Sequence, residues 1–302
     1  MIGDIMREGI KISLMVVAII MAVGLAIVIG CSQKAEEAKV SSDGIDFVTD
    51  YAKALEIAQE KDQKIIIDFY TDWCVWCKRL DTFTYSDSAV IEFSKSIVFA
   101  KINAEVDTLT AQKYVIPGYP TVVIAESDGT EIERIGGFLP AEEFIQTVND
   151  YLNDVGTLAD YLRMADTNAT VEVNYVIGEK YESRGMYEEA KTYYQKVIDA
   201  DPDDREGYTG DAMLSMGGLY IRDKEYDKGI DQFREVINKY KDTETAIDGE
   251  LWLGYALRKK GDTAAAIGHY EAFLKNYSDF ENSDRIKETI EKLKNPPPTE
   301  AG

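Results

Sequence analysis

A buried strand followed at once by two closely spaced cysteines constrains this chain more than any other feature. The strand is the apolar run Ile65-Ile66-Ile67-Asp68-Phe69-Tyr70, and the cysteines are Cys74 and Cys77. If the second cysteine opens a helix, Cys74 lies at the helix N-terminus, where the helix dipole favours the thiolate over the thiol. A thiolate attacks disulfides, so Cys74 is a candidate nucleophile.

Cys77 follows one helical turn later and supplies the second thiol that resolves a mixed disulfide. The alternatives are a structural disulfide and half of a zinc site. Zinc needs four ligands, and the only other cysteine and the only histidine are Cys31 and His269, both distant in sequence. A four-residue disulfide loop constrains little of the unfolded chain. We expect no metal and no cofactor beyond a redox-active Cys74–Cys77 disulfide, with His269 as a partly exposed helix residue.

Composition indicates a globular protein whose partner is not a nucleic acid. The 302 residues suffice for two domains, with 45% hydrophobic and 29% charged residues. The net charge of −22 has the wrong sign for binding phosphates.

The first thirty residues predict export. Arg7 and Lys11 precede an apolar stretch over residues 12–29, which is typical of a signal peptide. The run Val28-Ile29-Gly30-Cys31 resembles the lipobox of bacterial lipoproteins, a resemblance that makes Cys31 the lipidated residue. Ser32 after it favours an outer membrane by the same resemblance. The alternative is an uncleaved membrane-spanning helix, since the stretch is just long enough. We expect residues 1–30 to be signal peptide or anchor and 31–44 to be a polar tether, with the remainder outside the cytoplasm.

Strands alternate with helices between residues 45 and 153. The pattern predicts strands at 65–70, 97–102 and 121–125, and a hairpin strand at 130–135 after the turn Ser127-Asp128-Gly129. Predicted helices cover 50–62, the segment from Cys77 towards Phe83, 109–114 and 140–152. This order gives an α/β fold with a mixed sheet covered by helices on both faces.

Residues 45–153 resemble the thioredoxin family. Trp73 precedes the cysteine pair, Asp68 lies six residues before Cys74, and Lys101 matches the lysine that neighbours this acid. The segment Gly118-Tyr119-Pro120-Thr121 matches the loop whose proline is cis in the family, and Gly136 matches a late glycine. The resemblance implies a thiol–disulfide oxidoreductase fold.

Asp68 and Lys101 have a physical role that supports this resemblance. An acid on an interior strand has a raised pKa, which makes Asp68 a candidate proton acceptor for Cys77, with Lys101 in support. The alternative is an acid at a strand end that simply pairs with Lys101.

Four residues are candidates for binding the substrate. A cis bond before Pro120 would turn the backbone of Tyr119 towards the sulfurs, where an extended client can pair with it, whereas a trans proline would form an ordinary turn. Trp73 and Trp76 flank the nucleophile and form a candidate apolar rim, although Trp73 has packing as an alternative role.

Val75-Trp76 between the cysteines and the extra segment 82–87 make the domain similar to the C-terminal domain of DsbD-type thiol:disulfide interchange proteins. That similarity implies an extracytoplasmic disulfide reductase that acts on client protein disulfides. The chain lacks the multi-span electron channel of that family, so we expect a separate protein to donate or accept its electrons.

A repeat is visible after residue 170. Three glycines, Gly178, Gly217 and Gly254, each precede an aromatic residue by sixteen positions: Tyr194, Phe233 and Tyr270. The pattern resembles tetratricopeptide repeats and predicts an all-α solenoid at 171–294, with inter-helix turns at Gly185 and Gly261 and a closing helix at 282–293. The resemblance implies a protein or peptide partner, with a spacer role as the alternative. A linker at 154–170 and a disordered tail at 295–302 complete the chain.

Together these features predict a membrane-tethered thiol–disulfide oxidoreductase whose repeats recruit a partner. The competing hypothesis is a non-enzymatic adaptor that uses the repeats and a redox-inactive fold.

Overall fold

The computed structural model describes residues 44–296. The predicted signal or anchor at 1–30, the lipidation site Cys31, nearly all of the tether and most of the tail lie outside this range. None of the helices in the described range is long and apolar enough to cross a membrane.

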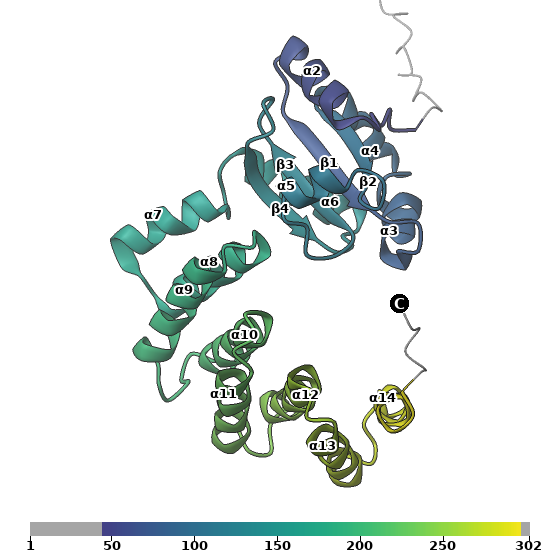
Figure 1. Ribbon diagram of the computed structural model, residues 1–302. Helices are drawn as coiled ribbons and strands as arrows, with labels where there is room; N and C mark the ends of the chain where they lie inside the picture. Colours follow the sequence, from purple (N-terminus) through teal and green to yellow (C-terminus); the bar gives the residue numbers. More distant parts are fainter. Residues whose placement is uncertain (1–43, 297–302) are drawn as a thin grey trace, which may run out of the picture. The chain divides into compact units, whose positions relative to one another are not determined.

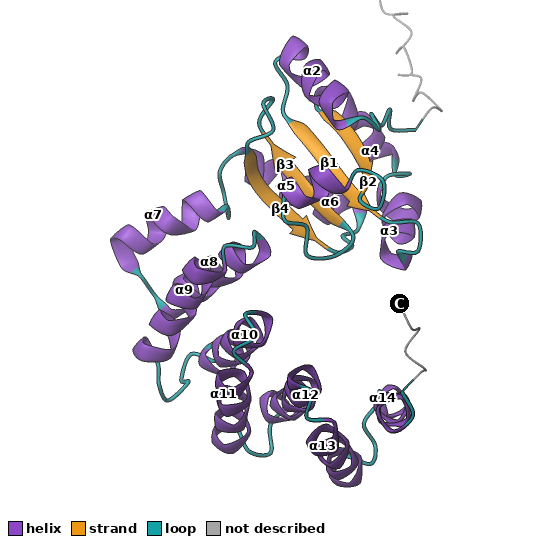
Figure 2. Cartoon of the chain, viewed as in Figure 1, coloured by secondary structure: helices purple, strands orange, loops and turns teal. Residues whose placement is uncertain are grey.

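Residues 51–152 alternate between helices and strands, as the sequence predicts (Figure 2). The strands are β1 (Ile65–Tyr70), β2 (Val98–Asn103), β3 (Thr121–Ala125) and β4 (Glu131–Gly136). The helices are α2 (Tyr51–Lys61), α3 (Val75–Arg79), the π-helix η1 (Leu80–Thr84), α4 (Ser88–Phe93), the 3₁₀-helix η2 (Ser94–Ser96), α5 (Thr108–Lys113) and α6 (Ala141–Leu152).

The four strands form one mixed sheet in the order β2-β1-β3-β4. β1 runs parallel to β2 and antiparallel to β3, and β3 and β4 form the predicted hairpin. β1 is central, and five of its six residues are buried. Its carboxyl end therefore delivers the chain to the cysteine pair from the interior of the domain.

Helices cover both faces of the sheet (Figure 1). Ile65, Ile67 and Phe69 of β1 pack with residues of α2 and α5 on one face. Ile66 packs on the other face with residues of η1, α4 and α6. Because side chains alternate along a strand, Asp68 shares the second face with Ile66.

The segment after the cysteines differs from the predicted helix. The helix begins at Val75 rather than Cys77 and passes directly into η1. η1 and its C-cap bury Leu80, Thr84 and Tyr85 in the second core, which explains the extra length of this segment. Asp87 is the N-cap of α4, and its side chain accepts a hydrogen bond from Ala89 N–H.

The second half is all helical, which confirms the predicted fold class. Its helices are α7 (Leu158–Asn168), α8 (Val171–Ser183), α9 (Tyr187–Ala200), α10 (Thr209–Arg222), α11 (Tyr226–Lys239), α12 (Glu244–Lys260), α13 (Thr263–Asn276) and α14 (Ser283–Lys294). α14 is the predicted closing helix. The segment at 154–170, interpreted from sequence as a linker, contains α7, which Thr157 caps by accepting from Asp160 N–H.

Each repeat is held together by the contact between a glycine and an aromatic ring. A Cβ on Gly217 would lie 2.4 Å from the ring of Phe233, and a Cβ on Gly254 would lie 2.3 Å from the ring of Tyr270. Gly178 faces Tyr194 in the same way, at 2.6 Å. The three rings are buried. The glycines thus let the two helices of a repeat approach closely, with a ring in the gap between them.

The turns inside the repeats require a left-handed backbone. Gly185 and Gly261 have φ of +72° and +88°, as their predicted turn positions require. In the middle repeat the same position is held by Lys224, with φ of +64°. That turn could not be predicted from the sequence, because a lysine does not mark a left-handed residue.

Candidate functional site

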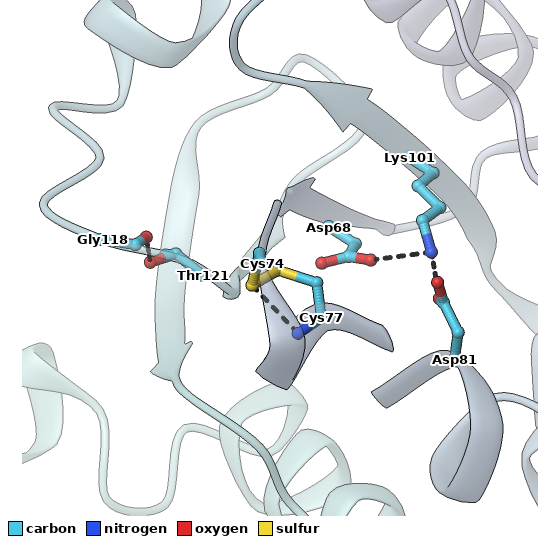
Figure 3. Close-up of a disulfide and its surroundings, with 7 residues drawn as sticks. All are labelled: Asp68, Cys74, Cys77, Asp81, Lys101, Gly118 and Thr121. Atoms are coloured by element: carbon cyan, nitrogen blue, oxygen red, sulfur yellow. Dashed lines mark hydrogen bonds and ion pairs between the residues drawn. A yellow bond between two sulfur atoms is a disulfide. The ribbon is translucent and has the colours of Figure 1, made fainter. Parts of the chain in front are cut away.

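The cysteine pair lies where the chain leaves β1 and enters α3. Cys74 and Cys77 form a disulfide with their Cα atoms 5.3 Å apart (Figure 3). Cys74 is the N-cap of α3, and its Sγ accepts a hydrogen bond from the backbone N–H of Cys77 at 3.0 Å. In the reduced protein this donor and the N-terminal end of α3 stabilise negative charge on Cys74 Sγ.

The disulfide is recessed between exposed apolar side chains. Cys74 is 4% exposed and Cys77 is 2% exposed, so both cysteines are buried. Trp73, Val75 and Trp76 are each more than half exposed and surround them. The cysteine pair is therefore bordered by an exposed apolar rim.

Asp68 is buried behind the cysteines, at 1% exposure. Neither of its carboxylate oxygens has a hydrogen-bond partner within the described residues. Burial raises the pKa of Asp68 to about 7, against an opposing effect of Lys101 and with a smaller contribution from Asp81. A carboxylate with this pKa accepts a proton near neutral pH, which is the predicted role of Asp68.

Lys101 faces Asp68 across the β1–β2 pair, where the two residues are in register. Its Nζ lies 3.6 Å from Asp68 Oδ2 and makes a closer contact with Asp81 Oδ1 (Figure 3). Three aromatic rings surround the ammonium: Phe47, Tyr70 and Tyr85, with centroids 5.2 to 5.5 Å away. Lys101 is thus fixed between two carboxylates.

Sequence reasoning missed Asp81. It lies in η1, twenty residues from Lys101, and only the π-helical turn of η1 brings it to the lysine. In the sequence, Asp81 is distinguished only by its position seven residues after Cys74. That spacing does not by itself predict a contact with Lys101.

The proline loop lies on the other side of the disulfide in Figure 3. The Tyr119–Pro120 peptide bond is cis, as the family resemblance implies. Thr121 Oγ1 donates to Gly118 O at 2.8 Å within this loop. The Tyr119 ring packs edge-on against Trp73, with centroids 6.0 Å apart. The structure therefore joins Tyr119 and Trp73 in one surface beside the nucleophile.

The two tryptophans differ in their anchoring. Trp73 donates from Nε1 to Glu105 at 3.0 Å, while Trp76 lies 6.4 Å from the Phe138 ring and 4.9 Å from the Arg79 guanidinium. Both rings remain exposed despite these contacts. The packing alternative for Trp73 holds only in part, since 65% of the residue stays exposed.

Comparison with known families agrees with both halves of the fold. The thioredoxin family profile matches residues 47–150. Tetratricopeptide repeat profiles match residues 171–204, 211–243 and 248–279. The chain carries a thioredoxin domain followed by tetratricopeptide repeats.

Curated relatives include DsbD-type proteins. The chain is 28% identical over 130 residues to the thiol:disulfide interchange protein DsbD of Vibrio vulnificus strain YJ016, covering 40% of this chain and 21% of that protein. It is 32% identical over 105 residues to DsbD of Pasteurella multocida strain Pm70, covering 32% of this chain and 18% of that protein. The match thus spans about a fifth of these relatives.

Among solved structures, the oxidised C-terminal domain of DsbD from Neisseria meningitidis is similar at 25% identity. The match covers 35% of this chain and 98% of that domain, with a TM-score of 0.31.

Proposed function

We propose that this protein is a membrane-tethered, extracytoplasmic thiol–disulfide oxidoreductase that reduces disulfides in client proteins. The observation that carries the proposal is the disulfide at the start of α3, with the Cys77 N–H on Cys74 Sγ and the buried Asp68 behind it. The matches to DsbD-type relatives support the same chemistry and the location outside the cytoplasm.

The reaction has two exchange steps. The Cys74 thiolate attacks one sulfur of a client disulfide, a new S–S bond forms, and the other client sulfur leaves as a thiolate that takes up a proton. Asp68 then accepts the proton of the Cys77 thiol, and the Cys77 thiolate attacks Cys74 Sγ. The second client sulfur is released, so the client is reduced by two electrons and Cys74–Cys77 is oxidised.

The protein needs a second partner that returns two electrons to the Cys74–Cys77 disulfide. We propose that this partner is a separate protein with a dithiol of its own, and that the repeats recruit a protein partner. The catalytic cycle needs no other cofactor and no metal.

Membrane tethering through Cys31 belongs to the same proposal, with an uncleaved helix at 12–29 as the alternative anchor. The domain limits at 45–153 and 171–294 are part of it as well. Replacing Cys31 by serine distinguishes the two anchors, because the substitution removes the site of lipid attachment. The variant is released from membranes if the lipid is the anchor and stays bound if the helix is.

The decisive test is insulin reduction by the full chain, kept in mild detergent and supplied with dithiothreitol. We expect Cys74→Ser to lower the rate over the dithiothreitol background by at least about 100-fold, because it removes the nucleophile. Cys77→Ser, reduced and then freed of dithiothreitol before insulin is added, should trap a client mixed disulfide, visible on a non-reducing gel. Equal rates for wild type and Cys74→Ser would rule out the enzyme.

The recessed position of Cys74 favours one other candidate function. With Cys74 only 4% exposed, the domain would serve as a docking platform in a non-enzymatic adaptor. The same assay decides between the two, since an adaptor gives no rate above background and no trapped mixed disulfide.

A further inference from the structure

A groove is lined by residues of the repeat helices and by Pro117 of the proline loop. It has a volume of about 530 Å³, within the range of ligand-binding sites. α8, α10 and α12 contribute Glu179, Glu182, Ser215 and Trp252, and Pro117 is a further lining residue. Pro117 lies three residues before the cis-proline Pro120, so the groove adjoins the chain segment that shapes the redox site.

The groove carries carboxylates that have no cationic partner. Within residues 44–296, neither Glu179 nor Glu182 forms an ion pair, and Glu182 accepts only from the Tyr194 hydroxyl at 2.6 Å. Loss of solvent raises the pKa of Glu182 and also that of Glu179, which is further raised by repulsion from Glu182 and Asp211. These carboxylates repel one another, and a bound cation would relieve the repulsion.

The cations near the groove are already engaged. Arg222 lines it, but its guanidinium lies 3.2 Å from the Tyr187 ring centroid and donates to Asp223 at 2.9 Å. Lys180 follows Glu179 in sequence but pairs with the buried Glu133 at 2.9 Å. The free charge of the groove is therefore negative.

Apolar contact surface complements this charge. Trp252 is 41% exposed, and its ring stacks on Phe233 with centroids 5.9 Å apart, which fixes its orientation. Tyr187 offers a second ring in the groove. Aromatic faces beside carboxylates bind the aliphatic stem and the charged head of lysine and arginine together.

Ion pairs fix α8, and with it one wall of the groove, to β4 of the thioredoxin domain. Glu133 of β4 binds Lys180 and Arg184 of α8, and Arg134 Nη1 donates to Ser183 O at 2.6 Å. A ligand in the groove is thereby held next to Pro117 and the loop that follows it.

We propose that this groove binds a cationic, extended segment of the client polypeptide and so selects the disulfides that reach Cys74. The inference rests on the proposed reductase function and deepens it by naming the chemistry of the client. The occupant is lysine- or arginine-rich chain, because only a cation neutralises Glu179 and Glu182 while packing on Trp252.

Binding is tested with the full chain and two cysteine-free peptides, one rich in lysine and one with glutamine at each lysine position. We expect fluorescence anisotropy to show the lysine peptide binding at least about tenfold more tightly, and this preference to weaken between low and high salt. The groove variant Glu179→Gln/Glu182→Gln should bring the two affinities to within about twofold of each other.

A matched control removes the same number of charges, two, outside the groove. Glu189→Gln/Glu235→Gln changes exposed positions of α9 and α11 and should keep the preference. Circular dichroism of both variants checks that each is folded. Equal binding of the two peptides to wild type, or a preference that survives in the folded groove variant, would overturn the inference.

A second readout separates this inference from the reductase proposal. The same peptides, each extended by a disulfide-bonded cysteine pair, are offered as substrates, and the ratio of their kcat/KM values is measured. Reduction of both at equal kcat/KM would sink the inference and leave the reductase intact. Preferential binding of the lysine peptide without any reduction would sink the reductase and leave the groove assignment intact.

Discussion

The Lys101 ammonium stops 3.6 Å from the carboxylate of Asp68, beyond hydrogen-bond distance. The two residues are in register on adjacent strands, so the backbone positions do not cause this separation. Lys101 is held instead by a closer contact with Asp81 and by three aromatic rings. The lysine therefore compensates the burial of Asp68 only in part, and the pKa of Asp68 stays at about 7.

Asp68→Asn should abolish the pH dependence of client reduction near neutrality. A base with a pKa of about 7 is mostly protonated at pH 6 and mostly ionised at pH 8, so the wild-type rate should rise about tenfold between them. The asparagine variant should be slower by at least about tenfold at pH 8 and nearly flat. Asp72→Asn, an exposed carboxylate beside the site, serves as the control and should keep the wild-type profile.

The same substitution should stabilise the oxidised protein, and only at high pH. The folded-state pKa is raised from 3.8 to about 7, so the ionised carboxylate destabilises the fold fully above pH 7 and not at all below pH 3.8. Asp68→Asn should therefore raise the free energy of unfolding by up to about 4 kcal/mol at pH 8 and by much less at pH 4. Urea denaturation followed by the fluorescence of Trp73 and Trp76 measures both values. An equal gain at both pH values would contradict the assignment.

Asp81→Asn should move the pH profile of client reduction to lower pH. Removing this carboxylate takes away one charge that raises the pKa of Asp68 and frees Lys101 to move towards it. A fall of half a unit in that pKa makes reduction at pH 6 about threefold faster. Asp81→Glu keeps the charge and should retain the wild-type profile. A lower rate with an unmoved midpoint would mean that Asp81 acts only on the structure.

Gly217→Ala and Gly218→Ala should shift stability in opposite directions although they are neighbours in α10. A Cβ on Gly217 would lie 2.4 Å from the buried ring of Phe233, whereas a Cβ on Gly218 meets nothing within 4 Å. Overpacking costs about 1–3 kcal/mol, while alanine in an open helical position gains about 0.5–1 kcal/mol. Thermal denaturation followed by circular dichroism measures both, and a destabilised Gly218→Ala would show that the contact is not the cause.

The sequence predicted the features that local patterns determine. The apolar runs mark β1 and β3 because a strand buried on both faces has few polar residues, and the turn before β4 follows from Ser127-Asp128-Gly129. Asp50 and Asp62 are the N-cap and C-cap of helix α2, and they are also the two ends of the helix predicted at 50–62. In the repeats, a fixed spacing between a glycine and an aromatic residue was enough to predict the helix pairs, because the two residues touch within a single pair.

Contacts between segments that are distant in the sequence could not be predicted from local patterns. Asp81 meets Lys101 only because η1 is π-helical, and no residue type in η1 signals that turn. Glu133 and Lys180 are forty-seven residues apart and carry no shared motif. Lys224 adopts a left-handed backbone in place of a glycine because the repeat geometry around it requires one.

Glu133→Gln should strongly destabilise the contact between β4 and α8. Glu133 is 1% exposed and pairs with Lys180 and Arg184, so its loss leaves the partly buried Lys180 without its ion-pair partner and Arg184 with Glu131 alone. Breaking such a buried cluster costs about 3–5 kcal/mol. Glu143→Gln, at an exposed position of α6, is the control and should change the free energy of unfolding by less than about 0.5 kcal/mol.

The pH dependence of that loss distinguishes charge from packing. Burial opposes ionisation of Glu133, but Arg184 and Lys180 together outweigh it and hold the pKa of Glu133 below its usual value of 4.5. The stabilisation is therefore present above pH 4.5 and is lost as the pH falls through the lowered pKa. The difference in urea midpoint between wild type and Glu133→Gln should be large at pH 7 and should shrink as the pH approaches 3. A difference of the same size at both pH values would mean that the shape of the side chain, and not its charge, holds α8 on β4.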